Sequence, residues 1–343
     1  MYPNNADLFA LDANGNPIPN VPHFDLTSPT ANQIRNLSNY IYSTNNYAPT
    51  KLNSHGLYLQ DQITYKKWQV LLSLRREYYN DLLNFGTESE EEVTQSVWLP
   101  RAGLVYSLNN NVNLYGTYVA GYQPQSASAI NDPLAGGPFD PLESNMIEFG
   151  AKTDWIEGRL GVSVAVYDLT QTGTLFPAND VNNPELLRQI GEEQSRGIEF
   201  DVTGRISSNW SIVASAAYIK ATITESDEEA EIGRQKPNTP SATGNIWTKY
   251  VIDNGPLTGL GFGLGANFVS ERFGSIVFDQ NNVPTFPSYE IINAGLYYTA
   301  DKFQIQVNLN NVFDQTHWVG GYDYIRAFPG SPRAVLTTVS YTF

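Results

Sequence analysis

The chain has 343 residues, of which 16% are charged, 13% are aromatic and none is cysteine. The charged fraction lies well below the roughly 25% of an ordinary globular protein. No run of about 18 apolar residues is present, which excludes a helical membrane protein. The lack of cysteine removes disulfides and thiolate metal sites, and a formal charge of −15 without a basic stripe argues against nucleic acid as a partner.

Residues 1–53 show no regular periodicity and are rich in Asn and Pro, as in Asn14–Asn20. We expect them to form an extracellular loop region, with Asn36–Tyr47 as the best place for one further strand. Met1–Asn5 contains no basic segment followed by an apolar core, so we expect no signal peptide in this sequence.

From Ser54 to the C-terminus, apolar residues alternate with small or polar ones, most clearly in Leu160–Tyr167 and Phe303–Asn310. Successive side chains of a strand point to opposite faces, so this alternation indicates strands with one apolar face. It predicts thirteen strands, at 54–65, 67–79, 97–107, 111–122, 142–154, 159–171, 194–206, 209–223, 239–252, 257–270, 286–299, 302–311 and 332–343.

The connections between these strands alternate in length. Six are tight turns rich in Asn, Gly, Asp and Lys, and six are loops of roughly 15 to 22 residues. Outer-membrane β-barrels have short periplasmic turns and long external loops, whereas a soluble sandwich or propeller has no reason for this sorting. Counting strands back from Phe343 at the periplasmic rim places every short turn in the periplasm.

The number of strands is odd, whereas bacterial barrels of one chain have even numbers. Two explanations stay open. One strand lies within residues 1–53, or the chain is the back part of a larger barrel.

Two acidic runs, Glu88–Glu92 and Asp227–Glu231, lie in predicted loops. Solvated loop charge explains them most simply. Bridging by divalent cations at an anionic membrane surface is the alternative.

Several phrases in fixed order carry a resemblance to a known family. They are His55–Gln62, Pro100–Tyr106, Leu114–Tyr118, Gly121–Pro124, Ile147–Lys152, Val166–Thr170, Ser195–Phe200, Leu309–Asp314 and Gly330–Arg333. In this order and spacing they resemble the C-terminal part of TonB-dependent siderophore receptors, nearest to the ferrichrome-receptor branch. The resemblance covers residues 54–343.

The resemblance implies an all-β fold, a transmembrane antiparallel β-barrel in the outer membrane of a Gram-negative bacterium. About 13 C-terminal strands of a 22-stranded barrel would be present, and the plug domain would be absent. It further implies a ferric siderophore bound at the external loops, with energy supplied by the TonB complex acting on the missing plug. Iron enters only within the ligand, so no cofactor is expected.

Other partners follow from the same resemblance. Outer-membrane lipid and lipopolysaccharide would surround the barrel, and the barrel-assembly machinery would read the terminal strand that ends in Phe343. The family gives no reason to expect enzyme activity.

Alternation places seven charged residues on the polar face that would line the barrel: Arg75, Glu77, Glu148, Lys152, Glu199, Asp201 and Arg205. A charge on the lipid side near the midplane would cost about 2–4 kcal/mol, which fixes this register. These charges either pair across neighbouring strands and hold water, or contact a plug.

A ferric siderophore needs a concave aromatic surface with a few hydrogen-bond donors, because its iron is already saturated. Our candidates for contact with the ligand are Phe139, Phe176, Trp318, Tyr322, Tyr324 and Arg326, and Phe273 and Phe278 are further loop aromatics. The final long loop, Thr316–Tyr324, combines aromatics with a glycine pair and is the strongest candidate. Interfacial or loop packing is the alternative role for each aromatic.

Two other functions compete with the receptor. A passive general porin has a similar length and also ends on Phe, but it should begin with a strand. A barrel hydrolase would need clustered His with Ser or Asp, whereas His23, His55 and His317 are far apart in the sequence, with no zinc or triad spacing.

Overall fold

The computed structural model describes residues 49–88, 90–125, 134–137, 139–178, 180, 182–183, 186–274, 285–321 and 327–343. These residues form strands and one short 3-10 helix. In chain order they are β1 (Lys51–Tyr65), β2 (Trp68–Leu83), β3 (Glu91–Ser107), β4 (Val112–Gln123), β5 (Leu142–Trp155), β6 (Leu160–Pro177), β7 (Leu187–Arg205), β8 (Trp210–Glu225), η4 (Glu229–Glu231), β9 (Ala242–Val251), β10 (Leu260–Val269), β11 (Arg272–Phe273), β12 (Thr285–Phe286), β13 (Tyr289–Ala300), β14 (Phe303–Asn310), β15 (Trp318–Gly321), β16 (Ala327–Pro329) and β17 (Ala334–Tyr341).

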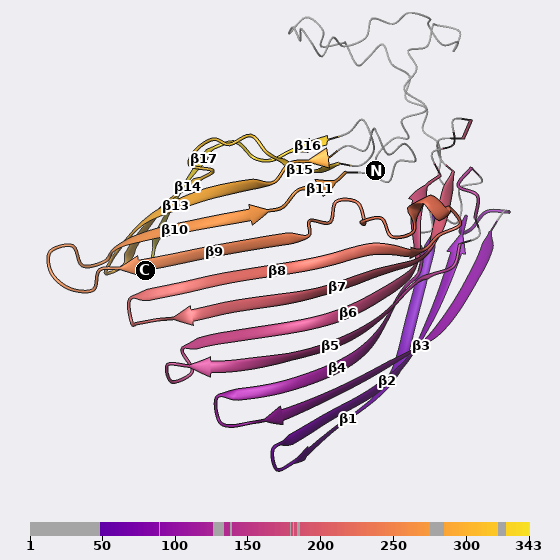
Figure 1. The fold of residues 1–343 in the computed structure, drawn as a ribbon, viewed down its shortest axis with the longest axis horizontal. Helices are drawn as coiled ribbons and strands as arrows, with labels where there is room; N and C mark the ends of the chain where they lie inside the picture. Colours follow the sequence, from indigo (N-terminus) through magenta and orange to yellow (C-terminus); the bar gives the residue numbers. More distant parts are fainter. Residues whose placement is uncertain are drawn as a thin grey trace, which may run out of the picture. The chain divides into compact units, whose positions relative to one another are not determined.

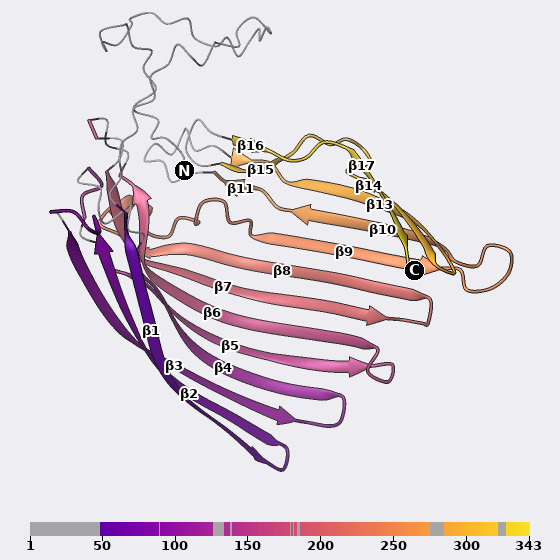
Figure 2. The same ribbon diagram turned by 180° about the vertical axis from the view of Figure 1, so that it is seen from behind.

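Thirteen of these strands form one sheet in the order β1-β2-β3-β4-β5-β6-β7-β8-β9-β10-β13-β14-β17, which confirms the predicted number. Neighbours in the sheet are neighbours along the chain apart from two small hairpins, β11–β12 and β15–β16, that lie inside long connections. Figures 1 and 2 show the short turns along one edge of the sheet and the long connections along the other. We call these edges the turn end and the loop end.

The predicted strand boundaries hold to within three residues at the turn end. At the loop end, the strands from β1 to β8 reach as far as predicted or farther, whereas β9, β10, β13, β14 and β17 stop one to three residues short of the prediction. β6 continues to Pro177 and β7 begins at Leu187, so their connection is shorter than expected. The loop between β2 and β3 likewise shrinks to residues 84–90. The extra residues pair as strands without apolar alternation, because neither of their faces needs to be apolar there.

The chain divides into two parts that we describe separately. Leu52–Asp81 and Val93–Phe343 form the larger part, which holds nearly all of the main sheet. The smaller part contains Leu82–Glu92 and the residues up to Lys51. Within it the Phe85 amide donates to the Pro49 carbonyl at 2.7 Å, and the Lys51 ammonium lies 4.9 Å from the Phe85 ring centre. The predicted strand at 36–47 lies outside the described residues.

The two faces of the main sheet differ in chemistry. Ile147 and Phe149 of β5 and Ile198 and Phe200 of β7 point to one face and are 44–60% exposed. We call this the outer face. Large apolar residues left uncovered along many strands fit contact with lipid. Among the described residues, no helix is both long and apolar enough to cross a membrane.

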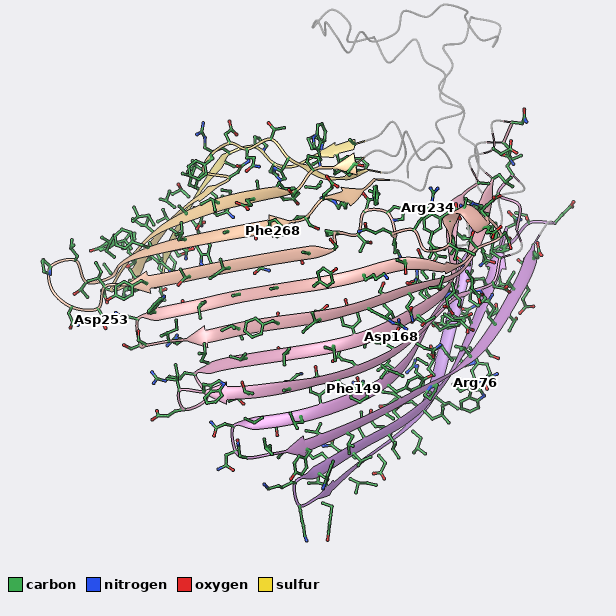
Figure 3. The ribbon with its side chains drawn as sticks, in the orientation of Figure 1. Arg76, Phe149, Asp168, Arg234, Asp253 and Phe268 are labelled. Atoms are coloured by element: carbon green, nitrogen blue, oxygen red, sulfur yellow. The ribbon has the colours of Figure 1, made fainter. Side chains whose placement is uncertain are left out.

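The apolar band of the outer face stops at a charged pair toward the loop end. Asp168 lies opposite Ile147 in the register, one step beyond the level of Phe149 (Figure 3). The Arg196 guanidinium donates to the Asp168 carboxylate at 2.8 Å, and both side chains are well exposed. A charged pair costs little free energy only where water or lipid headgroups reach it. The pair therefore marks the edge of the lipid-facing band.

The inner face is polar and holds aromatic rings flat against glycines. The Tyr115 ring covers Gly150 of the next strand so closely that a Cβ there would lie 2.6 Å from it. Gly150 is therefore required for the ring to lie along the sheet, where its hydroxyl reaches neighbouring side chains.

Candidate functional site: the inner wall and the external loops

The predicted inner charges form two groups on the described sheet. Arg75 and Glu77 are two residues apart on β2 and therefore share a face. Their side chains form an ion pair over Gly56 of β1, and the Glu77 side chain is only 9% exposed. This pair lies on a single strand, whereas the sequence led us to expect pairs across neighbouring strands.

The second group lies on β5 and β7, and the register aligns its members across β6, which runs between them. Lys152 lies opposite Ser163, which in turn lies opposite Asp201, while Glu148 lies opposite Tyr167. The Ser163 hydroxyl donates to the Asp201 carboxylate at 3.3 Å. Three strands thus bring predicted charges from distant parts of the sequence onto one patch of the inner face.

Tyrosines connect the charges of this patch. The Tyr115 hydroxyl lies close to the Glu148 carboxylate, and the Lys152 ammonium lies 5.2 Å from the Tyr115 ring centre. The Tyr167 hydroxyl likewise lies close to the Glu199 carboxylate. Three carboxylates and one ammonium give the patch an acidic surface on which tyrosine hydroxyls satisfy part of the negative charge.

Arg205 is the one predicted inner charge that lies apart from both groups. It is the last residue of β7, at the turn end, and its side chain is exposed. Its amide bonds to the Arg159 carbonyl at 2.8 Å, which joins two neighbouring turns.

The loop end of β6, β7 and β8 holds a small core. Ile190 and Ile223 are fully buried, and Phe176 packs against them. Phe176, expected in an external loop, thus lies in β6 and packs against the neighbouring strands. Its contact with a ligand stays a prediction.

Two buried ion pairs fix the segment after β8 to this core. Arg188 forms a two-pronged pair with Glu231 of η4, whose side chain is 1% exposed. The Lys236 ammonium donates to Glu193 at 2.8 Å, and Glu193 is 3% exposed. From the sequence we expected solvated charge or cation bridging for the acidic run around Glu231, whereas this member is buried and paired. Nothing in the local pattern distinguishes Glu231 from its exposed neighbours.

Phe139 directly precedes Asp140, which lines a hollow near the same end of the sheet. Asp140 and Gln189 line this hollow, which has a volume of about 370 Å³. The Asp140 amide donates to the Gln189 side-chain oxygen at 3.0 Å, and the Gln189 amide group donates back to the Asp140 carbonyl at 2.6 Å. Phe139 itself is half-buried.

Three external connections meet at Asn238. Its side-chain amide donates to the Gly321 carbonyl at 2.7 Å and its side-chain oxygen accepts from the Gly321 amide at 2.9 Å. Its backbone amide donates to the Phe273 carbonyl at 2.7 Å. Asn238 has a φ of 56°, a left-handed conformation that Asn tolerates better than most residues. The connections after β8, β10 and β14 are therefore joined at one residue.

Arg272 supports the same junction from β11. The residue is 3% exposed, and its guanidinium donates to the Trp318 carbonyl at 2.6 Å. The guanidinium also lies 5.6 Å and 5.7 Å from the ring centres of Phe286 and Tyr289. It therefore holds the β15–β16 hairpin, which presents Trp318. Trp318 belongs to the final long loop, our strongest candidate for contact with a ligand.

Trp318 is 36% exposed and Phe273 is 39% exposed, so both present aromatic surface at the loop end. Tyr322, Tyr324, Arg326 and Phe278 lie outside the described residues. Asn238 and Arg272 are not among the residues that the sequence predicted. The flanking prolines Pro237 and Pro240 give a weak turn signal for Asn238, whereas no local signal exists for Arg272.

The described residues contain no metal-binding cluster. Within the described ranges, no group of three or more His, Asp or Glu side chains could hold a metal ion.

Comparison with known proteins gives the family. The family model described as "TonB dependent receptor-like, beta-barrel" matches residues 4–312. The metal-pseudopaline receptor CntO of Pseudomonas aeruginosa is 28% identical over 301 residues, covering 85% of this chain and 41% of the receptor. The ferrichrome outer membrane transporter/phage receptor of Escherichia coli is 26% identical over 301 residues, covering 85% of this chain and 38% of the transporter.

A solved structure shows the same fold. The ferripyoverdine receptor of the outer membrane of Pseudomonas aeruginosa superposes with a TM-score of 0.74 at 20% identity, covering 94% of this chain and 43% of that chain. The chain thus spans about two fifths of the length of the proteins it matches. It belongs to the TonB-dependent receptor β-barrel family and is an outer-membrane protein of a Gram-negative bacterium.

Proposed function

We propose that this chain supplies wall and external mouth to a receptor that takes up ferric siderophores. The observation that carries the proposal is the junction at Asn238 and Arg272, which fixes the β15–β16 hairpin and holds Trp318 partly exposed at the loop end. A rigid aromatic on a supported hairpin is what recognition of a compact, saturated chelate requires.

The inner wall supports the second half of the proposal. The acidic, tyrosine-rich patch of Glu148, Lys152, Glu199 and Asp201 is polar and hydrogen bonded, as a surface against a plug would be. In this proposal TonB acts on a plug that contacts the patch. Lipopolysaccharide contacts the outer face near the Asp168–Arg196 pair, and the assembly machinery reads β17 and Phe343.

The ligands after which related receptors are named support ferric siderophores as the substrate class. They leave the particular siderophore open. They include metal-pseudopaline, ferrioxamine B and ferrichrome. Family membership favours the receptor over the passive porin, because its relatives are named as receptors and transporters.

A binding assay tests the proposal. The chain, in outer-membrane vesicles of a strain without other siderophore receptors, is titrated with labelled ferric hydroxamates, catecholates and ferric citrate. One class should bind, and Trp318→Ala should weaken it by about 10-fold, because a buried aromatic anchor contributes on the order of 1–2 kcal/mol. Trp318→Phe should retain most of the affinity. Equal, weak retention of all ligands by the native chain and Trp318→Ala would contradict the proposal.

A further inference from the structure

A hollow at the turn end concentrates positive charge in an otherwise acidic protein. It lies between the β1–β2 and β3–β4 turns, has a volume of about 460 Å³, and is lined by Lys66, Lys67, Ser107, Leu108 and Asn109–Asn111. No acidic residue lines it, although the chain as a whole carries a charge of −15. Other turns carry Glu157, Asp253 or Asp301.

The backbone of this hollow is held in place. The Ser107 amide donates to the Lys67 carbonyl at 2.8 Å, and the Lys67 ammonium donates to the Leu108 carbonyl at 2.7 Å. Lys66 has a φ of 55°, so the two-residue turn is tight. Both lysine residues stay exposed. An ammonium has three donor hydrogens, so Lys67 retains capacity for a second acceptor.

An apolar groove on the outer face begins where this hollow ends. The groove has a volume of about 680 Å³, and its lining includes Trp68 and Tyr106, which directly adjoin Lys67 and Ser107 in the sequence. The Trp68 and Tyr106 rings lie 4.5 Å apart between centres. Small residues, among them Ala102 and Gly116, form part of its lining.

The groove rises through about two thirds of one lipid leaflet. Trp68 to Leu72 spans four residues, or about 13 Å along β2 at about 3.3 Å per residue. A strand tilt of roughly 40° reduces the rise to about 10 Å. One leaflet of a bilayer with a hydrocarbon core of about 30 Å is about 15 Å deep. The groove therefore fits an acyl chain of the leaflet at the turn end.

We propose that the hollow and the groove together form a binding site for one anionic glycerophospholipid of the periplasmic leaflet. The phosphate and the anionic headgroup accept hydrogen bonds from Lys66 and Lys67, with the asparagine run as further donors. One acyl chain lies in the groove past Trp68 and Tyr106. The charge of the hollow selects an anionic lipid, and the short turns place the site on the periplasmic side.

Quenching of Trp68 fluorescence tests this site. The chain is reconstituted in phosphatidylcholine vesicles that contain a minor fraction of brominated phosphatidylglycerol or, separately, brominated phosphatidylcholine. Subtracting the signal of Trp68→Phe isolates the emission of this tryptophan. Brominated phosphatidylglycerol should quench it at a several-fold lower mole fraction, since each lysine near an anionic surface changes affinity roughly fivefold.

Variants separate the two parts of the site. K66Q/K67Q should abolish the preference for phosphatidylglycerol, and Ala102→Leu should weaken quenching by filling the groove. Lys302→Gln, at the β13–β14 turn, is the matched control and should leave the preference unchanged. Equal quenching of the native chain by both lipids, or a preference that survives K66Q/K67Q, would overturn the proposal. So would relief of quenching by added lipid A that exceeds relief by unlabelled phosphatidylglycerol.

Discussion

The two ends of the sheet are stabilised in different ways. At the turn end, short connections close through backbone hydrogen bonds, such as that between the Ile206 amide and the Trp210 carbonyl at 2.8 Å. At the loop end, side chains bridge segments that are far apart in the sequence, as Asn238 does with Gly321. The difference shows that the barrel wall follows from local pattern, whereas the mouth depends on a few individual residues.

The largest expected effect is at the loop end, for Glu231→Ala. Removal of this carboxylate leaves Arg188 without its bidentate partner in a buried site, and losing one member of a buried pair costs about 3–5 kcal/mol. Protease cleavage between residues 226 and 238 should rise accordingly. Glu229→Ala, an exposed residue of the same short helix, is the control and should behave like the native chain. Equal cleavage in the two variants would contradict the different roles given to the buried Glu231 and the exposed Glu229.

The next effect concerns the strands between the two ends. Ile198→Arg places a charge on the outer face, where it should cost about 2–4 kcal/mol, while Glu199→Gln on the inner face should cost much less. Urea unfolding in lipid vesicles measures both. A greater loss for Glu199→Gln would reverse the assignment of the faces.

A smaller effect is expected for Asn238→Gly. Glycine keeps the left-handed conformation but loses both side-chain hydrogen bonds to Gly321, at a cost of about 2 kcal/mol. Trp318 should become more accessible to the aqueous quencher iodide. Unchanged quenching would show that the junction does not hold the hairpin.

The smallest effect belongs to the turn end. Ile156 has a φ of 53°, which is strained for a β-branched residue. Ile156→Asn should therefore stabilise the protein by about 1 kcal/mol in the same unfolding measurement. A loss of stability would mean that packing by Ile156 outweighs its backbone strain.

The sequence was sufficient to predict the strands and the face on which each side chain lies. In an alternating segment such as Ile147-Glu148-Phe149, apolar residues mark the lipid-facing side and polar residues mark the inner side. It was insufficient where that constraint ends. Thr172–Pro177 and Leu187–Glu193 extend β6 and β7 without alternating, so the prediction stopped too early. The patch on β5–β7 required the register, which a single sequence does not supply.

The external junction was beyond sequence reasoning for a different reason. Asn238 and Gly321 are separated by 83 positions, and the bonds between them join a side chain to the backbone. Such contacts leave no periodic signal. Arg272 and Trp318, 46 positions apart, present the same difficulty.

The most direct test of the account uses the absence of cysteine from the chain. Single cysteines placed at each position from 197 to 202 carry a spin label, and its collision rates with oxygen and with a water-soluble nickel chelate are measured in lipid vesicles. We predict a period of two, with positions 198, 200 and 202 accessible to oxygen and positions 197, 199 and 201 accessible to the chelate. Uniform accessibility along β7, or the opposite phase, would contradict a barrel wall with a lipid face and a polar inner face.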